Sequence, residues 1–248
     1  MSRASRGFRL FGKTVKILFF MLIFSVIFFL FWRVFSSDNP KSMEQLTIND
    51  KLVAAYEQDG NDLYMFNQHL DMITRADHNY GYFAVTDSVF IPAANQIQIT
   101  FRYNNSTITH LVEDKELDET PSRDDDLFDV TLLLATDLTP ENTEDNLGND
   151  PASVKMTRVH ASSVTAEKKN LYNYRRLVFD LDEVGVSLEE LLEDGLLLAV
   201  YTDVYYVGDV NYDETTYGTL CIYDHLANTY DVKLSGTDKR VLRKYGKN

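Results

Sequence analysis

The feature that most constrains this chain is an uncharged apolar run near its N-terminus, ILFFMLIFSVIFFLFW over residues 17–32. It contains no Pro and no Gly, and Ser25 is its only polar residue. At about 1.5 Å rise per residue, such a helix spans roughly 24 Å, and its flanks extend it toward the roughly 30 Å of a bilayer core. Lys16 and Arg33 bracket the run. The sequence therefore predicts a transmembrane helix over residues 17–35.

The charge before this run sets its expected orientation. Residues 1–16 carry five Lys and Arg residues and no Asp or Glu, and positive flanks stay in the cytoplasm. We expect a cytoplasmic basic tail over 1–16 and the rest of the chain outside the cell membrane. A cleaved signal peptide is the alternative, but its apolar core is shorter, at about 7–15 residues, and Ser36 and Ser37 form a poor cleavage site.

The chain beyond residue 35 is strongly acidic. It holds all 38 Asp and Glu residues but only 18 of the 24 Lys and Arg residues, a net charge of −20. This argues against a nucleic-acid partner, because phosphates are bound by Lys and Arg. The one cysteine, Cys221, excludes an internal disulfide, so an exported domain must rely on its core. These features are typical of a bacterial envelope protein.

Sequence patterns change from helical to strand-like along this acidic part. Residues 36–78 begin with a polar linker and continue with apolar residues at helical spacing up to Gly60 and again over 63–73, which predicts a helical neck. Residues 79–237 hold short alternating segments and one short helix, Ser187 to Gly195, with a capping box. The predicted strands are 96–103, 107–112, 128–136, 154–165, 171–181, 196–207, 217–224 and 230–234.

Strands at this spacing predict a mainly β fold, an antiparallel β-sandwich of immunoglobulin-like or jelly-roll-like type. Asn104 and Asn105 suit a tight turn, so 96–103 and 107–112 are expected to form a hairpin, and 217–224 and 230–234 a second one. The strand over 196–207 is apolar on both faces and is expected at the centre of the sheet.

Tyrosines are dense toward the end of the predicted sandwich. Exposed rings on a sheet can stack on sugars or anchor a protein partner, although Tyr is also a common strand residue. The candidate ligand-binding residues are Tyr201, Tyr205, Tyr206, Tyr212 and Tyr217.

One loop carries oxygen side chains at alternate positions, a pattern that can converge on Ca²⁺. Glu214 and Leu220 stand where an EF-hand loop needs Gly and Glu, so an ordinary polar loop is the alternative. The acidic loop 137–150 is a weaker calcium candidate, and no other cofactor is predicted. The candidate metal ligands are Asp209, Asn211 and Asp213.

The C-terminal segment 238–248 reverses the charge of the domain. Its cations can fold back on the acidic body or contact an anionic surface such as a membrane or a phosphate-bearing wall polymer. With few apolar residues, this basic tail is expected to be dispensable for folding. The candidate surface-binding residues are Lys239, Arg240, Arg243, Lys244 and Lys247.

These patterns predict a single-pass membrane protein whose extracytoplasmic domain is a binding or interaction module for an envelope glycan, a wall polymer or a protein partner. A structural accessory subunit of a membrane assembly is the alternative. The sequence has no zinc-ligand spacing, phosphate-binding loop or nucleophile motif, so no catalytic residue is predicted. A carboxylate-based hydrolase remains a less favoured alternative, only because two of the 38 acidic residues could lie at the separation that glycoside hydrolysis requires.

Overall fold

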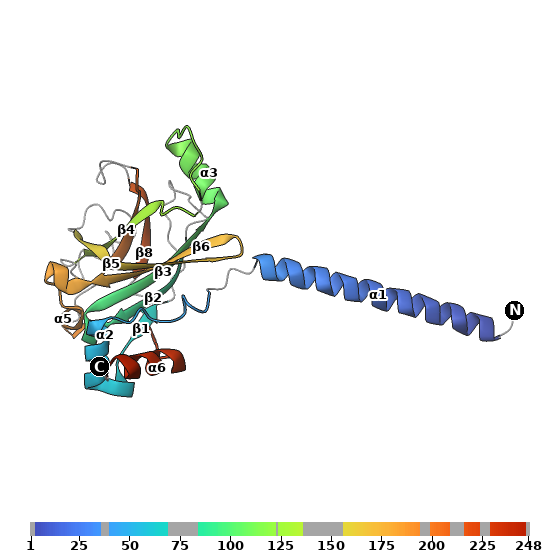
Figure 1. Ribbon diagram of the computed structural model, residues 1–248, viewed down its shortest axis with the longest axis horizontal. Coiled ribbons are helices and arrows are strands. Elements are labelled where there is room, and N and C mark those ends of the chain that lie inside the picture. The colour runs from blue at the N-terminus through green and yellow to red at the C-terminus, as the bar shows by residue number, and fades with distance from the viewer. Residues whose placement is uncertain are drawn as a thin grey trace, which may run out of the picture. The chain divides into compact units, whose positions relative to one another are not determined.

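The chain forms two compact units, Met1–Asp38 and Asn39–Asn248, shown in Figure 1. The structure, a computed structural model, describes residues 3–35, 40–68, 84–122, 124–135, 156–193, 199–208, 216–223 and 229–246.

The first unit contains a single described helix, α1 (Arg3–Phe35). Its side chains from Lys13 to Arg33 are exposed, and the helix over this stretch is long and apolar enough to cross a membrane. The predicted apolar helix is therefore confirmed, and it continues backward through the basic segment before it.

The second unit is built on an antiparallel sheet whose described strands follow the order β8-β7-β4-β5-β6-β3-β2-β1-β9. The prediction of a mainly β, antiparallel fold is confirmed. The strands are β1 (Phe66–Gln68), β2 (Ala84–Ile91), β3 (Gln96–Asn104), β4 (Phe128–Ala135), β5 (Met156–Lys169), β6 (Tyr172–Asp180), β7 (Ala199–Tyr206), β8 (Thr216–Tyr223) and β9 (Thr229–Asp231).

Strand β5 connects the two halves of this sheet. Met156 to His160 pairs with β4, whereas Ala161 to Lys169 pairs with β6, and the register shifts at Ser162. Apolar side chains of β3 and β6 on one half, and of β4 and β7 on the other, belong to one core cluster. Strands β2 and β8, near opposite ends of the order, are in contact. The sheet therefore curves around a shared core.

A second, smaller core lies on the other face of the sheet. It is formed by Val89 and Ile91 of β2, Leu52 of α2 and Leu242 of α6, among others. Figure 1 shows α2 and α6 together, away from α3. The helices of the second unit are α2 (Asp50–Asp59), α3 (Asn105–Asp114), α5 (Leu188–Glu193) and α6 (Gly236–Tyr245), with 3-10 turns η1 (Gly60–Asp62), η2 (Pro92–Ala94) and η4 (Leu181–Val184).

Several predicted elements agree with these helices and strands. Strand β3 covers the predicted 96–103, β4 and β6 match within a residue or two, and α5 begins after Ser187, whose hydroxyl accepts a hydrogen bond from Glu190 N at 3.2 Å. The predicted end of the first neck helix at Gly60 is also confirmed, since this residue is the C-cap of α2 with φ of 62°.

The predicted hairpin after β3 is wrong, because the chain enters helix α3 instead. The side chain of Asn104 accepts hydrogen bonds from Ser106 N and Thr107 N, and so caps the helix. Ile108 and Leu111, at helical spacing, are both buried. Asparagine therefore acts here as a helix cap rather than as a turn residue.

Three other expectations of the sheet also fail. Strands β8 and β9 lie at opposite ends of the order, because β9 pairs with β1, so the last hairpin does not form. Strand β7 lies next to the end strand β8 rather than at the centre. Phe66–Gln68, expected within a second neck helix, is strand β1; Phe66 stacks on Phe90 with ring centroids 4.8 Å apart, which places it in the sheet.

Candidate functional site

A polar ladder holds the segment before α2 against the second face of the sheet. We call residues 43–49 the strap. Gln98 Oε1 accepts a hydrogen bond from Thr47 N at 2.8 Å, and its Nε2 donates to Thr47 O at 2.9 Å. Gln96 Nε2 donates to Asn49 Oδ1 at 3.2 Å, the same atom that caps α2. The two glutamines, both fully buried, therefore bind the strap as a neighbouring strand would.

An ion pair between a buried arginine and a partly buried aspartate lies beneath the strap. Arg176 is 2% exposed and donates to Asp87 Oδ2 at 2.9 Å and to the carbonyl of Met43. Burial raises the pKa of Asp87 above its ordinary value, against the opposing effect of Arg176, and burial lowers the pKa of Arg176 against the effect of Asp87. Desolvation therefore opposes the attraction between the two groups, and the pair holds the Met43 carbonyl of the strap against the sheet.

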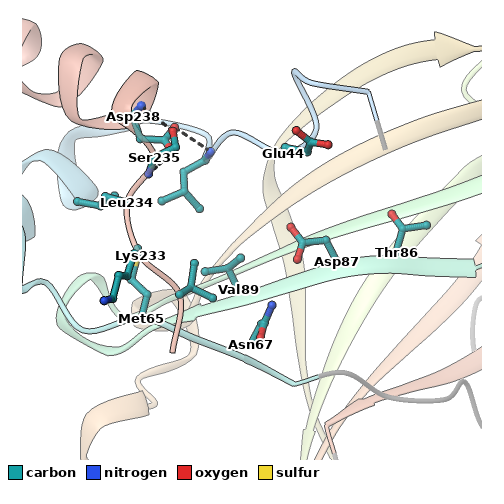
Figure 2. Close-up of a pocket in the computed structure, with 12 residues that line it drawn as sticks. Glu44, Met65, Asn67, Thr86, Asp87, Val89, Lys233, Leu234, Ser235 and Asp238 are labelled. Carbon is teal, nitrogen blue, oxygen red and sulfur yellow. Dashed lines mark hydrogen bonds between the residues drawn. The ribbon is translucent and has the colours of Figure 1, made fainter. Parts of the chain in front are cut away.

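Beside this pair lies a pocket of about 290 Å³ between the strap, β1, β2 and the start of α6. Figure 2 shows three carboxylates around it, those of Glu44, Asp87 and Asp238. Asp238 accepts from Leu46 N at 3.2 Å and from the Ser235 hydroxyl at 2.5 Å. Two of the three carboxylates therefore hold the strap and the α6 cap in place, and the described residues include no group of three side chains suited to a metal ion.

A larger pocket, of about 440 Å³, opens where β4 and β5 separate. Pairing between these strands ends at Thr131 and His160. We call the space between Phe128–Val130 of β4 and Ala161–Lys169 of β5 the fork. Beyond the last pair, β5 is bound to β6 on one side, and no described strand pairs with its other side. The fork therefore exposes a sheet edge directly beside a cavity.

The floor of the fork is apolar and its edge carries small side chains. Phe101, Phe128 and Leu177 line the cavity and are almost fully buried. Ala161 and Val164 line it from the edge, and Val164 is 50% exposed. A large side chain entering from outside would meet apolar carbon on the floor without displacing part of the described core.

An arginine supports this floor from within the sheet. Arg175, 4% exposed, donates to Tyr103 Oη at 3.2 Å and to the carbonyl of Asp125 at 3.3 Å, and its guanidinium lies over the Tyr103 ring. Its Nε lies 3.4 Å from Asp126 Oδ1. These bonds position the segment that leads into β4, and so position one wall of the fork.

That wall is acidic. Asp126 and Asp129 are among the residues that line the cavity, and Asp124 and Asp125 come just before them and are exposed. Lys168, near the far end of the β5 edge, forms an exposed ion pair with Asp124. Such a surface pair contributes little stability, so it can exchange with another cation at low cost.

The tyrosines expected to form a binding patch do not form one in the part of the chain that the structure describes. Tyr205 is fully buried, and Tyr206 is half-buried and packs against the core. Tyr201 lies on β7 and Tyr217 on β8, but their side chains, like the whole of Tyr212, fall outside the described residues.

The expected calcium ligands Asp209, Asn211 and Asp213, and the acidic loop 137–150, also lie outside the described residues, so these sites stay predictions. The basic residues Lys239, Arg240, Arg243 and Lys244 lie on α6, and Lys247 is not described.

Helix α6 packs against the second unit through Leu242 and Asp238, which are 0% and 4% exposed. Arg243 Nε also donates to Tyr56 Oη of α2 at 3.4 Å. The exposed cations Arg240 and Lys244 lie on the solvent side of this packed helix, and their contact with an anionic surface remains a prediction.

No family model, no curated protein and no solved structure matches this chain. Its function therefore has to follow from the chemistry of its own residues.

The fork residues are not among the sites expected from the sequence, although one signal for them exists. Strand β5 has 14 residues and β4 has 8, so β5 must extend past its neighbour. On its core side this extension carries Ala161, Val164 and Ala166. These side chains are too small to cover the apolar floor of the cavity, which another strand beside β5 would otherwise cover.

Proposed function

We propose that this protein is a membrane-anchored interaction module of the bacterial cell envelope. In this proposal α1 spans the cell membrane with its N-terminus in the cytoplasm, and the second unit, a curved sandwich-like sheet, lies outside. Five Lys and Arg residues and no acidic residue before the apolar run support this orientation.

The observation that carries the proposal is the edge of β5 in the fork, with which no described strand pairs. Unpaired backbone N–H and C=O groups along a strand are a template for another strand. Proteins that bind extended peptides by strand addition combine such an edge with a pocket for a side chain. Ala161 to Ala166 supplies the edge and the cavity beside it supplies the pocket. The partner is therefore a protein, bound through an extended segment.

A glycan partner finds less support among the described residues. Stacking on a sugar requires exposed aromatic faces, and the ring of Tyr205, one of the expected binding residues, is fully buried. The fork instead offers main-chain groups and an apolar cavity, which suit a peptide.

The experiment places a photo-activated cross-linker at Val164 in the full chain, in its native membrane. The control position is Leu171, which is 41% exposed in the turn after β5. We expect an adduct of defined mass from position 164 and none from position 171, with the cross-link mapping to one short segment of one partner protein.

A matched pair of variants tests whether the edge is used. Val164 pairs with Leu177 and Thr165 with Arg176, so their side chains lie on opposite faces of the same edge. With the cross-linker at Ala166, on the cavity side, Val164→Lys should abolish the adduct and Thr165→Lys should leave it. No adduct from the edge, or equal adducts from both variants, would contradict strand addition at the fork.

A further inference from the structure

The chemistry of the fork also restricts which segment can bind there, an inference that rests on the proposed function. We propose that the fork binds an extended segment of another protein in which a large apolar side chain stands next to a Lys or Arg. The apolar side chain enters the cavity, and the basic side chain contacts the acidic wall formed by Asp126 and Asp129.

The apolar requirement follows from the floor. Phe101, Phe128 and Leu177 close the bottom of the cavity, and Val130 and Val164 lie at its sides. A volume of about 440 Å³ is within the range of small-ligand pockets. A segment paired with the β5 edge alternates its side chains between the two faces, so one residue in two points to the cavity side.

The basic requirement follows from the charges around the opening. Asp126 and Asp129 line the cavity, and 69% of the Asp126 side chain is exposed. Of the two described cations close by, Arg175 lines the cavity with its Nε 3.4 Å from Asp126 Oδ1, and Lys168 is paired with Asp124. Neither of these ion pairs involves Asp129. The opening therefore presents negative charge, and an acidic segment would be repelled.

Charge also decides between possible occupants. A second copy of this chain would bring a domain with a net charge of −20 toward the acidic wall, and the chain's own loop 137–150 is itself acidic. Both are disfavoured relative to a basic segment of a different protein. Because side chains alternate along a strand, the basic residue adjacent to the apolar one points to the face of β4 that carries Asp129.

The test measures peptide binding to the full chain in nanodiscs of zwitterionic lipid. Three synthetic octapeptides share alternating Thr and Val flanks and differ at the centre, which is Leu-Lys, Leu-Glu or Ala-Lys. We expect the Leu-Lys peptide to bind at least about tenfold more tightly than either of the other two, and its affinity to fall with rising salt.

Variants of the acidic wall distinguish the effect of its charge on peptide preference from the effect of strand pairing on peptide binding. Asp126→Asn together with Asp129→Asn should remove the preference for Leu-Lys over Leu-Glu while both peptides still bind. Val164→Lys should abolish binding, and Thr165→Lys should not. Circular dichroism of each variant establishes that it is folded.

Two outcomes would overturn the inference, and they are distinguishable. If Leu-Lys and Leu-Glu bind equally and both depend on Val164, the basic requirement is wrong while strand addition stands. If the cross-linker at Val164 reacts only with loop 137–150 or with a second copy of the chain, both the inference and the proposed function fail.

Discussion

Gln98 binds Thr47 through both ends of its side-chain amide, with Thr47 N 2.8 Å from Oε1 and Thr47 O 2.9 Å from Nε2. Gln98 belongs to a central region of the sheet and is fully buried, whereas Thr47 lies in the strap that precedes α2. A side chain thus replaces the backbone of a neighbouring strand. The strap lies close to the start of the second unit, which begins at Asn39, so this amide fixes one of the first segments of the folded domain.

Gln98→Leu should release the strap while leaving the sheet intact. The substitution removes the two hydrogen bonds to Thr47 and a third, from Arg176 Nη1 at 3.5 Å. It leaves the backbone groups of Thr47 without their partner, which costs about 1–3 kcal/mol of unfolding free energy. Hydrogen exchange should accelerate at residues 43–49 and remain slow in β3 and β6. The matched control is Gln58→Leu, since Gln58 is exposed on α2. Unchanged exchange in the strap would show that Gln98 does not hold it.

Leu242→Ala should destabilise the second unit strongly. Leu242 is fully buried against α2 and β2 residues, and a cavity at such a site costs about 2–5 kcal/mol. The control is Tyr245→Ala, because that ring is 58% exposed. This reverses the expectation that segment 238–248 is dispensable for folding, and removal of the segment should lower the melting temperature of the β-sheet circular dichroism signal. A melting temperature equal to that of the intact chain would contradict the packing of α6.

Helix α6 shows why the packing of this segment was not predicted from the sequence. Its sequence, GTDKRVLRKY, has a high density of cations, which suggests a solvated tail. The capping box of Ser235 and Asp238 fixes where the helix starts, and this places Leu242 on the buried side. A single buried leucine in a basic segment is hard to predict from the sequence unless the capping box is recognised first.

The strands were easier to predict than their partners. Alternation in Gln96 to Tyr103 identifies β3 because its apolar residues face the main core. The same pattern suggests that Gln96 and Gln98 face solvent, whereas both are fully buried under the strap. Alternation specifies which residues share a face, but it does not specify which segment covers that face. Thr47, which covers Gln98, is 51 residues away in the sequence. The fork likewise depends on the residue at which β4 and β5 stop pairing. The sequence of neither strand alone specifies that residue.

Two aspartates near the strap should contribute to the unfolding free energy with opposite dependence on pH. Burial raises the pKa of Asp87 above 3.8, so the folded state holds this proton to higher pH than the unfolded state does. Its contribution to the unfolding free energy therefore falls as pH rises from 3.8 to the raised pKa. Hydrogen bonds from Lys51 and then Asn95 lower the pKa of Asp182 below 3.8. Its contribution is complete above 3.8 and is lost as pH falls through the lowered pKa.

The comparison of Asp87→Asn with Asp182→Asn isolates these two contributions. We expect the unfolding free energy of the native chain minus that of Asp87→Asn to decrease as pH rises above 3.8, by at most about 1.4 kcal/mol per pH unit. The corresponding difference for Asp182→Asn should increase with pH, and in the more acidic range below 3.8. Urea unfolding of the full chain in detergent micelles, repeated across both ranges, measures each difference. If the Asp87 difference instead rises with pH, attraction to Arg176 outweighs burial, and the pair beneath the strap stabilises the fold rather than only positioning it.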